Sequence, residues 1–235
     1  MKSILVIGLG RFGTCFAKTM VELGNEVMAI DVSEERVNEI APIVTSAEIG
    51  DCTREALIAS IGVRNFDLCV VAIGDNFQSS LEITALLKDY GAPYVLARAN
   101  RDVHAKFLLR NGADEVAYPE QALATHLATL HSSDSIFDFI RLNDEYSIYE
   151  IATPHEWVGK SILKANVRTK YGVNILAIKE GEELTPNPQP SYEFTGAEKL
   201  VVMATDRQLD ALLMRTVVRA AEGNSLCRLT ALKRL

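Results

Sequence analysis

The stretch GLGRFG, residues 8–13, follows the apolar run SILVIG and precedes a helical pattern. A continuous apolar run of this length is expected for a strand that is buried on both faces. Glycines in the order G-x-G-x-x-G between a strand and a helix form a loop whose backbone binds phosphate. Gly8 allows the tight turn, Gly10 lets a phosphate approach the backbone, and Gly13 lets the helix pack on the strand. We therefore predict a phosphate-binding loop in the first β-α unit of a parallel sheet.

The alternation of strand and helix patterns continues as far as residue 134. Five more β-rich runs follow, each with a helical pattern behind it: EVMAID (26–31), VTSAEIG (44–50), DLCVVAIG (67–74), YVLARA (94–99) and DEVAYP (114–119). Six β-α units in series indicate a parallel, doubly wound, Rossmann-like sheet. In the helix expected over 75–91, Asp75 and Gln78 have the spacing of a capping box. The sequence thus predicts a nucleotide-binding domain over 1–134.

Charged residues near the loop indicate the kind of nucleotide. Asp31 ends the second predicted strand, where a carboxylate accepts hydrogen bonds from both ribose hydroxyls and disfavours the 2′-phosphate of NADP. Arg11 stands between the second and third glycines, and arginine binds phosphate through bidentate, charge-assisted hydrogen bonds. Because ATP carries more phosphate charge than NAD, we interpret Arg11 as a contact to a terminal phosphate. The alternative is that Arg11 faces solvent or pairs with a neighbouring acid.

Ligands of doubly wound sheets bind beyond the carboxyl ends of the strands. The further candidates for this site are Phe12, Val32, Asp51, Cys52, Ala72, Ile73, Gly74, Asn76, Arg98 and Glu120. Asp51 and Cys52 follow the third strand, where an adenine would lie. Arg98 ends the fifth strand and is a second candidate phosphate or dimer contact, with a surface salt bridge as its alternative. A Rossmann-like domain whose site has decayed is the alternative for the whole set.

The pattern changes after residue 134. The run YSIYEIATP (146–154) alternates, two more β-rich runs occupy 173–181 and 199–205, and helical patterns occupy 159–172 and 206–223. These elements predict a small α+β domain over 145–222. The connecting segment 135–144 is too apolar for a free linker, so we expect it to pack either on the core of its own chain or against a second subunit in a dimer.

Composition restricts the class of protein. The formal net charge is −7, and residues 1–135 carry all of it, which argues against nucleic-acid binding. The four cysteines are scattered, which argues against a zinc site or a disulfide framework. There is no transmembrane-length apolar run and no signal-peptide pattern, so we expect a cytoplasmic protein. The basic tail over 223–235 is either a contact for a partner or acidic membrane surface, or a frayed end.

The chemistry of a dehydrogenase is not evident in the sequence. Such an enzyme needs a substrate domain with an acid or base for the alcohol proton, and the predicted second domain is small. We find no convincing set of lysine, histidine and aspartate, and no nucleophile with a partner base. A non-enzymatic nucleotide-binding protein is therefore favoured over an NAD(H)-dependent oxidoreductase. A redox-sensing repressor would need a helix-turn-helix and a basic face, which are not found.

The motifs together resemble a known family, the RCK (regulator of potassium conductance) domains of the KtrA and TrkA type. The resemblance rests on GLGRFG with Asp31, GDCT (50–53), AIGDNFQSS (72–80), ARA (97–99) and AYPE (117–120), in that order. The stretch from Trp157 to Ala204 resembles the companion RCK-C, or TrkA-C, domain. The likeness covers about 1–220.

The resemblance implies a cytosolic gating subunit of a Ktr- or Trk-type potassium uptake system. Such proteins bind ATP and ADP, or NAD(H) in some relatives, and form dimers that assemble into an octameric ring under a separate membrane subunit. They therefore lie at the inner face of the plasma membrane through their partner. Glu120 resembles the glutamate that joins Mg²⁺ or another cation beside the terminal phosphate. The second domain often binds cyclic di-AMP at a dimer interface, for which the candidates are Arg168, Asn174, Ile175 and Pro190.

Overall fold

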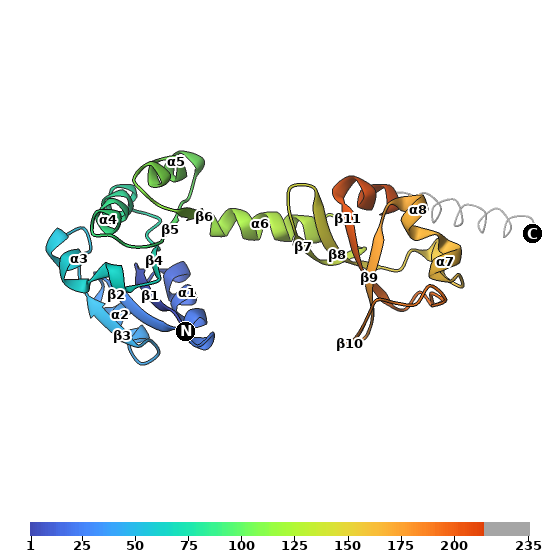
Figure 1. Ribbon diagram of the computed structural model, residues 1–235, viewed down its shortest axis with the longest axis horizontal. Helices are drawn as coiled ribbons and strands as arrows, with labels where there is room; N and C mark the ends of the chain where they lie inside the picture. The colour runs from blue at the N-terminus through green and yellow to red at the C-terminus, as the bar shows by residue number, and fades with distance from the viewer. Residues whose placement is uncertain (214–235) are drawn as a thin grey trace, which may run out of the picture. The chain divides into compact units, whose positions relative to one another are not determined.

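The computed structural model of the chain describes residues 1–213 (Figure 1). These residues divide into two compact units, Met1–Leu123 and a second unit that begins at Ala124. Each unit has one β-sheet and buried apolar residues of its own. The domain boundaries drawn from the sequence remain proposals, and the predicted tail over 223–235 lies outside the described residues.

The first unit is built on a six-stranded parallel sheet with the order β3-β2-β1-β4-β5-β6. Its strands are β1 (Ser3–Ile7), β2 (Glu26–Asp31), β3 (Ser46–Ile49), β4 (Leu68–Val71), β5 (Val95–Arg98) and β6 (Glu115–Ala117). This order confirms the predicted doubly wound sheet. The direction of winding reverses between β1 and β4, and a crevice forms at such a switch point.

Helices follow the strands of this sheet in alternation (Figure 1). They are α1 (Arg11–Glu22), α2 (Glu34–Ile40), α3 (Glu55–Ile61), α4 (Phe77–Asp89), α5 (Asp102–Arg110) and α6 (Pro119–Leu130), with a short 3₁₀ helix, η1 (Val63–Asn65). Leu5 and Ile7 of β1 belong to one apolar cluster, while Ile4 and Val6 belong to another. Because successive strand residues point to opposite faces, both faces of β1 are buried. This is why its sequence is apolar without alternation.

The start of α4 differs from the expectation. The helix begins at Phe77, and the side chain of Asn76 accepts a hydrogen bond from the backbone N–H of Ser79 at 3.0 Å. The predicted capping box at Asp75 and Gln78 is therefore wrong by one position. The side chain of Gln78 instead donates to Glu82, one turn further along the helix.

The second unit contains a five-stranded antiparallel sheet with the order β10-β9-β11-β8-β7. Its elements are β7 (Ile136–Arg141), β8 (Tyr146–Ala152), η2 (His155–Trp157), α7 (Ile162–Ala165), α8 (Val167–Tyr171), β9 (Asn174–Glu180), β10 (Glu183–Pro186) and β11 (Lys199–Thr205). Alternate residues of β8 and β11 are buried, as the patterns predicted. The small α+β unit is thus confirmed as a fold class.

The apolar segment 135–144 contains β7, a strand that the sequence pattern did not predict. Ile136 and Phe139 are buried in the core of the second unit. Phe137 and Ile140 are exposed, at 44% and 62%. Packing on the chain's own core therefore accounts for part of this segment, and its role in a dimer remains a proposal.

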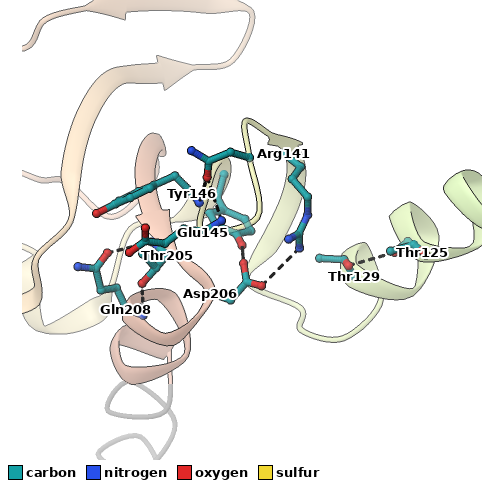
Figure 2. A network of polar contacts seen from close by, with 10 residues as sticks. Thr125, Thr129, Arg141, Glu145, Tyr146, Thr205, Asp206 and Gln208 are labelled. Carbon is teal, nitrogen blue, oxygen red and sulfur yellow. Dashed lines mark hydrogen bonds and ion pairs between the residues drawn. The ribbon is translucent and has the colours of Figure 1, made fainter. Parts of the chain in front are cut away.

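A polar network joins the segment that follows β11 to β8 and to β7 (Figure 2). Asp206 accepts a hydrogen bond from the Tyr149 hydroxyl and lies 3.4 Å from Nη2 of Arg141 on β7. The backbone N–H of Gln208 donates to Oγ1 of Thr205 at 3.2 Å, and Oε1 of Gln208 accepts from the N–H of Thr205. These paired bonds cap the helical turns over 206–213. The part of the helix predicted beyond 213 lies outside the described residues.

Candidate functional site

A cleft of about 450 Å³ lies at the carboxyl ends of the parallel strands. Its walls come from the ends of β1, β2, β4 and β5, the segment after β3, and the start of α4. This is where the strand order predicted a crevice. The first unit therefore has a preformed site large enough to take part of a nucleotide.

The glycine loop is shaped for close approach by a ligand. Gly8 has a φ of +94°, and its N–H donates to the carbonyl of Ile30 at 2.8 Å. A Cβ on Gly13 would lie 1.9 Å from the carbonyl oxygen of Gly8, so this glycine is needed for the helix to pack on the strand. A Cβ on Gly10 would meet no atom of the described chain within 4 Å. Gly10 therefore leaves the backbone open on the side of the cleft that it lines.

The first turn of α1 offers free donors beside Gly10. Gly10 is the N-cap residue, and no side chain of residues 1–213 caps this helix end. The first N–H groups of a helix have no partner within it and carry a partial positive charge. Such a helix start binds anions such as phosphate. The fit to a phosphate group is thus visible in the backbone itself.

Asp31 is held at the end of β2 by the backbone of two other segments. Its Oδ2 accepts from the N–H of Leu9 at 2.6 Å, and its Oδ1 accepts from the N–H of Ser33 at 2.8 Å. Nη1 of Arg36 lies 3.6 Å from Oδ2. Asp31 is only 6% exposed. A carboxylate has about four acceptor positions, so this fixed group can still accept from ligand hydroxyls.

Asp51 and Cys52 lie side by side in the wall of the cleft after β3. Hydrogen bonds from the hydroxyl and the N–H of Thr53, at 2.7 and 3.0 Å, lower the pKa of Asp51. Burial, reinforced by the charge of Asp51, raises the pKa of the Cys52 thiol to about 12. The pair therefore combines one negative charge with a neutral thiol at pH 7.

Arg98 is held in a narrow space at the end of β5. Its Nη2 donates to Oε1 of Glu120 at 2.5 Å. A Cβ on Gly74 would lie 2.6 Å from its Nη1. Asn100 donates from Nδ2 to the carbonyl of Gly74 at 2.6 Å, and its Oδ1 would lie 2.9 Å from the same Cβ. Gly74 thus provides the room in which the guanidinium lies.

The cleft brings most of the sequence-predicted residues together. Those that line it are Gly8, Gly10, Asp31, Val32, Asp51, Cys52, Ala72, Ile73, Gly74, Asn76 and Arg98. Four others lie outside its wall: Arg11, Phe12, Gly13 and Glu120. Arg11 is exposed at the first position of α1, and Phe12 packs with Phe16, with 5.8 Å between the ring centroids. The binding roles assigned to all of these residues remain predictions.

Sequence reasoning missed several lining residues. They are Ile7, Ile30, Arg36, Gly50, Thr53, Asp75, Ser79 and Ile83. Three of the polar ones, Arg36, Thr53 and Ser79, stand two or more residues beyond the strand ends. The signal that could have found Arg36 is its place in the first turn of the helix behind Asp31.

The cyclic di-AMP candidates lie in the second unit on separate elements. Arg168 is exposed on α8, and Asn174 and Ile175 are half-buried at the start of β9. The carbonyl of Pro190 accepts from the N–H of Leu163 at 3.0 Å. No hydrogen bond within residues 1–213 joins these four residues to one another. Their role as a ligand site remains a prediction.

No group of three or more histidine, cysteine, aspartate or glutamate side chains in the described part of the chain is arranged to hold a metal ion. The cation site predicted at Glu120 remains a prediction. No helix within residues 1–213 is long and apolar enough to cross a membrane.

Comparison with known proteins identifies the family. The TrkA-N domain matches residues 4–119, and the TrkA-C domain matches residues 146–216. The Ktr system potassium uptake protein C of Bacillus subtilis is 39% identical over 204 residues, which cover 87% of this chain and 92% of that protein. The chain belongs to the family of Ktr system potassium uptake proteins. The Ktr system potassium uptake protein A of the same organism is 38% identical, with 88% and 94% of the two chains covered. The predicted family is thereby confirmed.

Solved structures agree on the fold of this Ktr-family chain. The RCK domain of GsuK has a TM-score of 0.62 at 17% identity, with 90% of this chain and 46% of that chain covered. The GsuK channel bound to NAD has a TM-score of 0.63 at 18% identity, with 90% and 38% covered. The chain thus spans less than half of those longer chains. The likeness shows an RCK fold.

Proposed function

We propose that this Ktr-family chain is a cytosolic regulatory subunit, not an enzyme, that gates a separate potassium-translocating membrane subunit according to the nucleotide in its first unit. The observation that carries the proposal is one cleft in which an open glycine loop, the buried carboxylate of Asp31 and the guanidinium of Arg98 meet. That cleft belongs to a chain whose relatives are named for potassium uptake.

The residues present fit an adenine nucleotide. The first turn of α1 and Gly10 would bind phosphate through backbone N–H groups. Asp31 would accept hydrogen bonds from the ribose hydroxyls, and Asp51 and Cys52 would border the adenine. Arg98 would bind a phosphate through its guanidinium.

ATP and ADP would be distinguished at the outer end of the phosphate chain. Arg11 is exposed at the start of α1, and the ion pairs within residues 1–213 do not include it. It would contact the terminal phosphate, while Glu120 would join Mg²⁺ or another cation beside that phosphate. Nucleotides with and without this phosphate would then bind two conformations of the protein with different affinity. A ligand without such a difference shifts no equilibrium.

The second unit would add a further ligand and the assembly. We propose that Arg168, Asn174, Ile175 and Pro190 contribute to binding cyclic di-AMP where two chains meet. Dimers would assemble into an octameric ring beneath the membrane subunit, so that the chain lies at the inner face of the plasma membrane. A ring of eight sites would share the free energy needed to reverse a conformational equilibrium, ~5.5 kcal/mol for a change from 1:99 to 99:1.

An NAD(H)-dependent oxidoreductase or redox sensor is the competing function. Within residues 1–213, the wall of the cleft includes no histidine and no lysine, which are the usual acids and bases for hydride transfer to a carbonyl. This favours binding over turnover. Oxidation of NADH with a small carbonyl substrate would support the competing function.

Potassium uptake in cells that encode the chain tests the proposal. Gly10→Leu would fill the cleft beside the loop, whereas Lys18→Ala changes an exposed residue on the same helix. We expect Gly10→Leu and deletion of the gene to impair uptake at low external potassium to the same extent, and Lys18→Ala to leave it unchanged. Normal uptake with a folded Gly10→Leu protein would contradict the proposal.

A further inference from the structure

Glu120 forms an ion pair with Arg98, although Arg98 lines the cleft and Glu120 does not. Arg98 lines the cleft with a side chain only 16% exposed, whereas the side chain of Glu120 is 66% exposed and is absent from the wall. Glu120 is the second residue of α6. The 2.5 Å contact between Nη2 and Oε1 therefore joins a guanidinium in the cleft to the first turn of this helix.

Arg98 has unused donor capacity in a fixed position. Its Nε is buried and has no hydrogen-bond partner within the described chain. A guanidinium has five N–H donors in a rigid plane. A side chain at position 74 would meet Nη1, and the hydrogen bond from Asn100 to the Gly74 carbonyl fixes the backbone beside it. An anion that reaches Arg98 in the cleft therefore meets a guanidinium that Glu120 already partly neutralises.

We infer that Glu120 is an internal competitor for the phosphate subsite at Arg98, and that it sets which ligands the cleft selects. The inference rests on the proposed nucleotide binding. A phosphate brings more charge and more acceptor oxygens than a carboxylate, and two anions on one guanidinium repel each other. A phosphate ester that binds Arg98 therefore competes with Glu120 for the charge and the donors of the guanidinium. A nucleoside without phosphate does not meet this competitor.

Calorimetric titration of the full chain with ADP and with adenosine, in EDTA and without divalent cations, tests the inference. The variants are Glu120→Gln and, as a control of equal charge change, Glu115→Gln, whose glutamate on β6 accepts from the Tyr94 hydroxyl. We expect Glu120→Gln to bind ADP about five-fold more tightly than wild type, the upper end for a partly exposed ion pair. Adenosine affinity should not change, and the control should behave as wild type. Because EDTA removes divalent cations, a difference between the variants cannot come from a divalent cation bound at Glu120.

The outcomes separate this inference from the proposed function. Equal ADP affinity in wild type and Glu120→Gln, or weaker binding by the variant, overturns the competition and leaves nucleotide binding intact. Tighter binding of adenosine as well as ADP also overturns it, because the effect would not depend on phosphate. If ADP binds to the variant and not to the wild type, the competition from Glu120 is strong enough to prevent measurable binding, which supports the inference. ADP binding by neither protein overturns both the inference and the proposed function.

Discussion

At the scale of single residues, two glycines of the same loop have different roles. A Cβ on Gly13 would collide with the Gly8 carbonyl at 1.9 Å, whereas a Cβ on Gly10 meets nothing within 4 Å in the described structure. We expect Gly13→Ala to destabilise the first unit by several kcal/mol, as overpacking against backbone does. Gly10→Ala should fold normally and weaken nucleotide binding. Thermal unfolding and calorimetry of both variants measure this, and a normally stable Gly13→Ala protein would contradict it.

The cysteines differ in reactivity for the same local reasons. Burial raises the pKa of both Cys52 and Cys69 to about 12, so their thiols stay protonated, while Cys15 is exposed. Because the thiolate is the nucleophile, we expect iodoacetamide at pH 8 to modify Cys15 and to spare the two buried cysteines. Peptide mass spectrometry reads the sites, and the same treatment in urea provides the control. Rapid alkylation of Cys52 in the folded protein would show that this wall of the cleft opens.

At the scale of elements, Glu150 of β8 links β9 to β11 through Lys179 at 3.0 Å and Lys199 at 2.9 Å. Burial alone would raise the pKa of Glu150, but the hydrogen bonds from the two lysines outweigh it and lower the pKa. Because the pKa of Glu150 is lower in the folded state, its ionised form stabilises the fold at pH values above its ordinary pKa of 4.5. This contribution is lost as the pH falls through the pKa of the folded state.

Glu150→Gln should therefore lower the free energy of unfolding of the second unit at pH 7 by roughly 1 kcal/mol. Below pH 5, the variant should lose less stability than the wild type as the pH falls. Trp157, the one tryptophan of the chain, is buried in this unit, so its fluorescence reports the unfolding. Lys179→Met and Lys199→Met remove the two partners of Glu150 one at a time and serve as the matched variants. Parallel pH profiles for wild type and Glu150→Gln would contradict this role.

The same scale explains which elements the sequence could predict. The central strands β1 and β4 of the parallel sheet are apolar runs bounded by turn residues, and the positions of the strands could be predicted from such runs. Their spatial order was not predicted. β7 was not predicted from the sequence, because a register shift near Ile136 breaks the alternation of its buried residues. β10 was not predicted either, because all four of its residues are exposed and it ends at Pro186. Strand ends predicted most of the cleft. Arg36 and Ser79 could not be predicted, because their positions depend on how α2 and α4 sit against the sheet.

At the scale of the whole molecule, ligand binding should stabilise one unit more than the other. ADP at one hundred times its dissociation constant stabilises the state that binds it by ~2.7 kcal/mol. We expect hydrogen exchange to slow in Met1–Leu123, with little change in the unfolding reported by Trp157 in the second unit. An equal shift of both signals would mean that the two units unfold as one.

The most direct test of the account is calorimetric binding of ATP, ADP, NADH and cyclic di-AMP to the full chain, with and without magnesium. We predict that ATP and ADP bind, that magnesium strengthens only ATP, and that Arg11→Ala weakens ATP far more than ADP. Cyclic di-AMP should bind without competing with either nucleotide. Clear preference for NADH, with no binding of ATP or ADP, would contradict the account and leave Arg11 without a role.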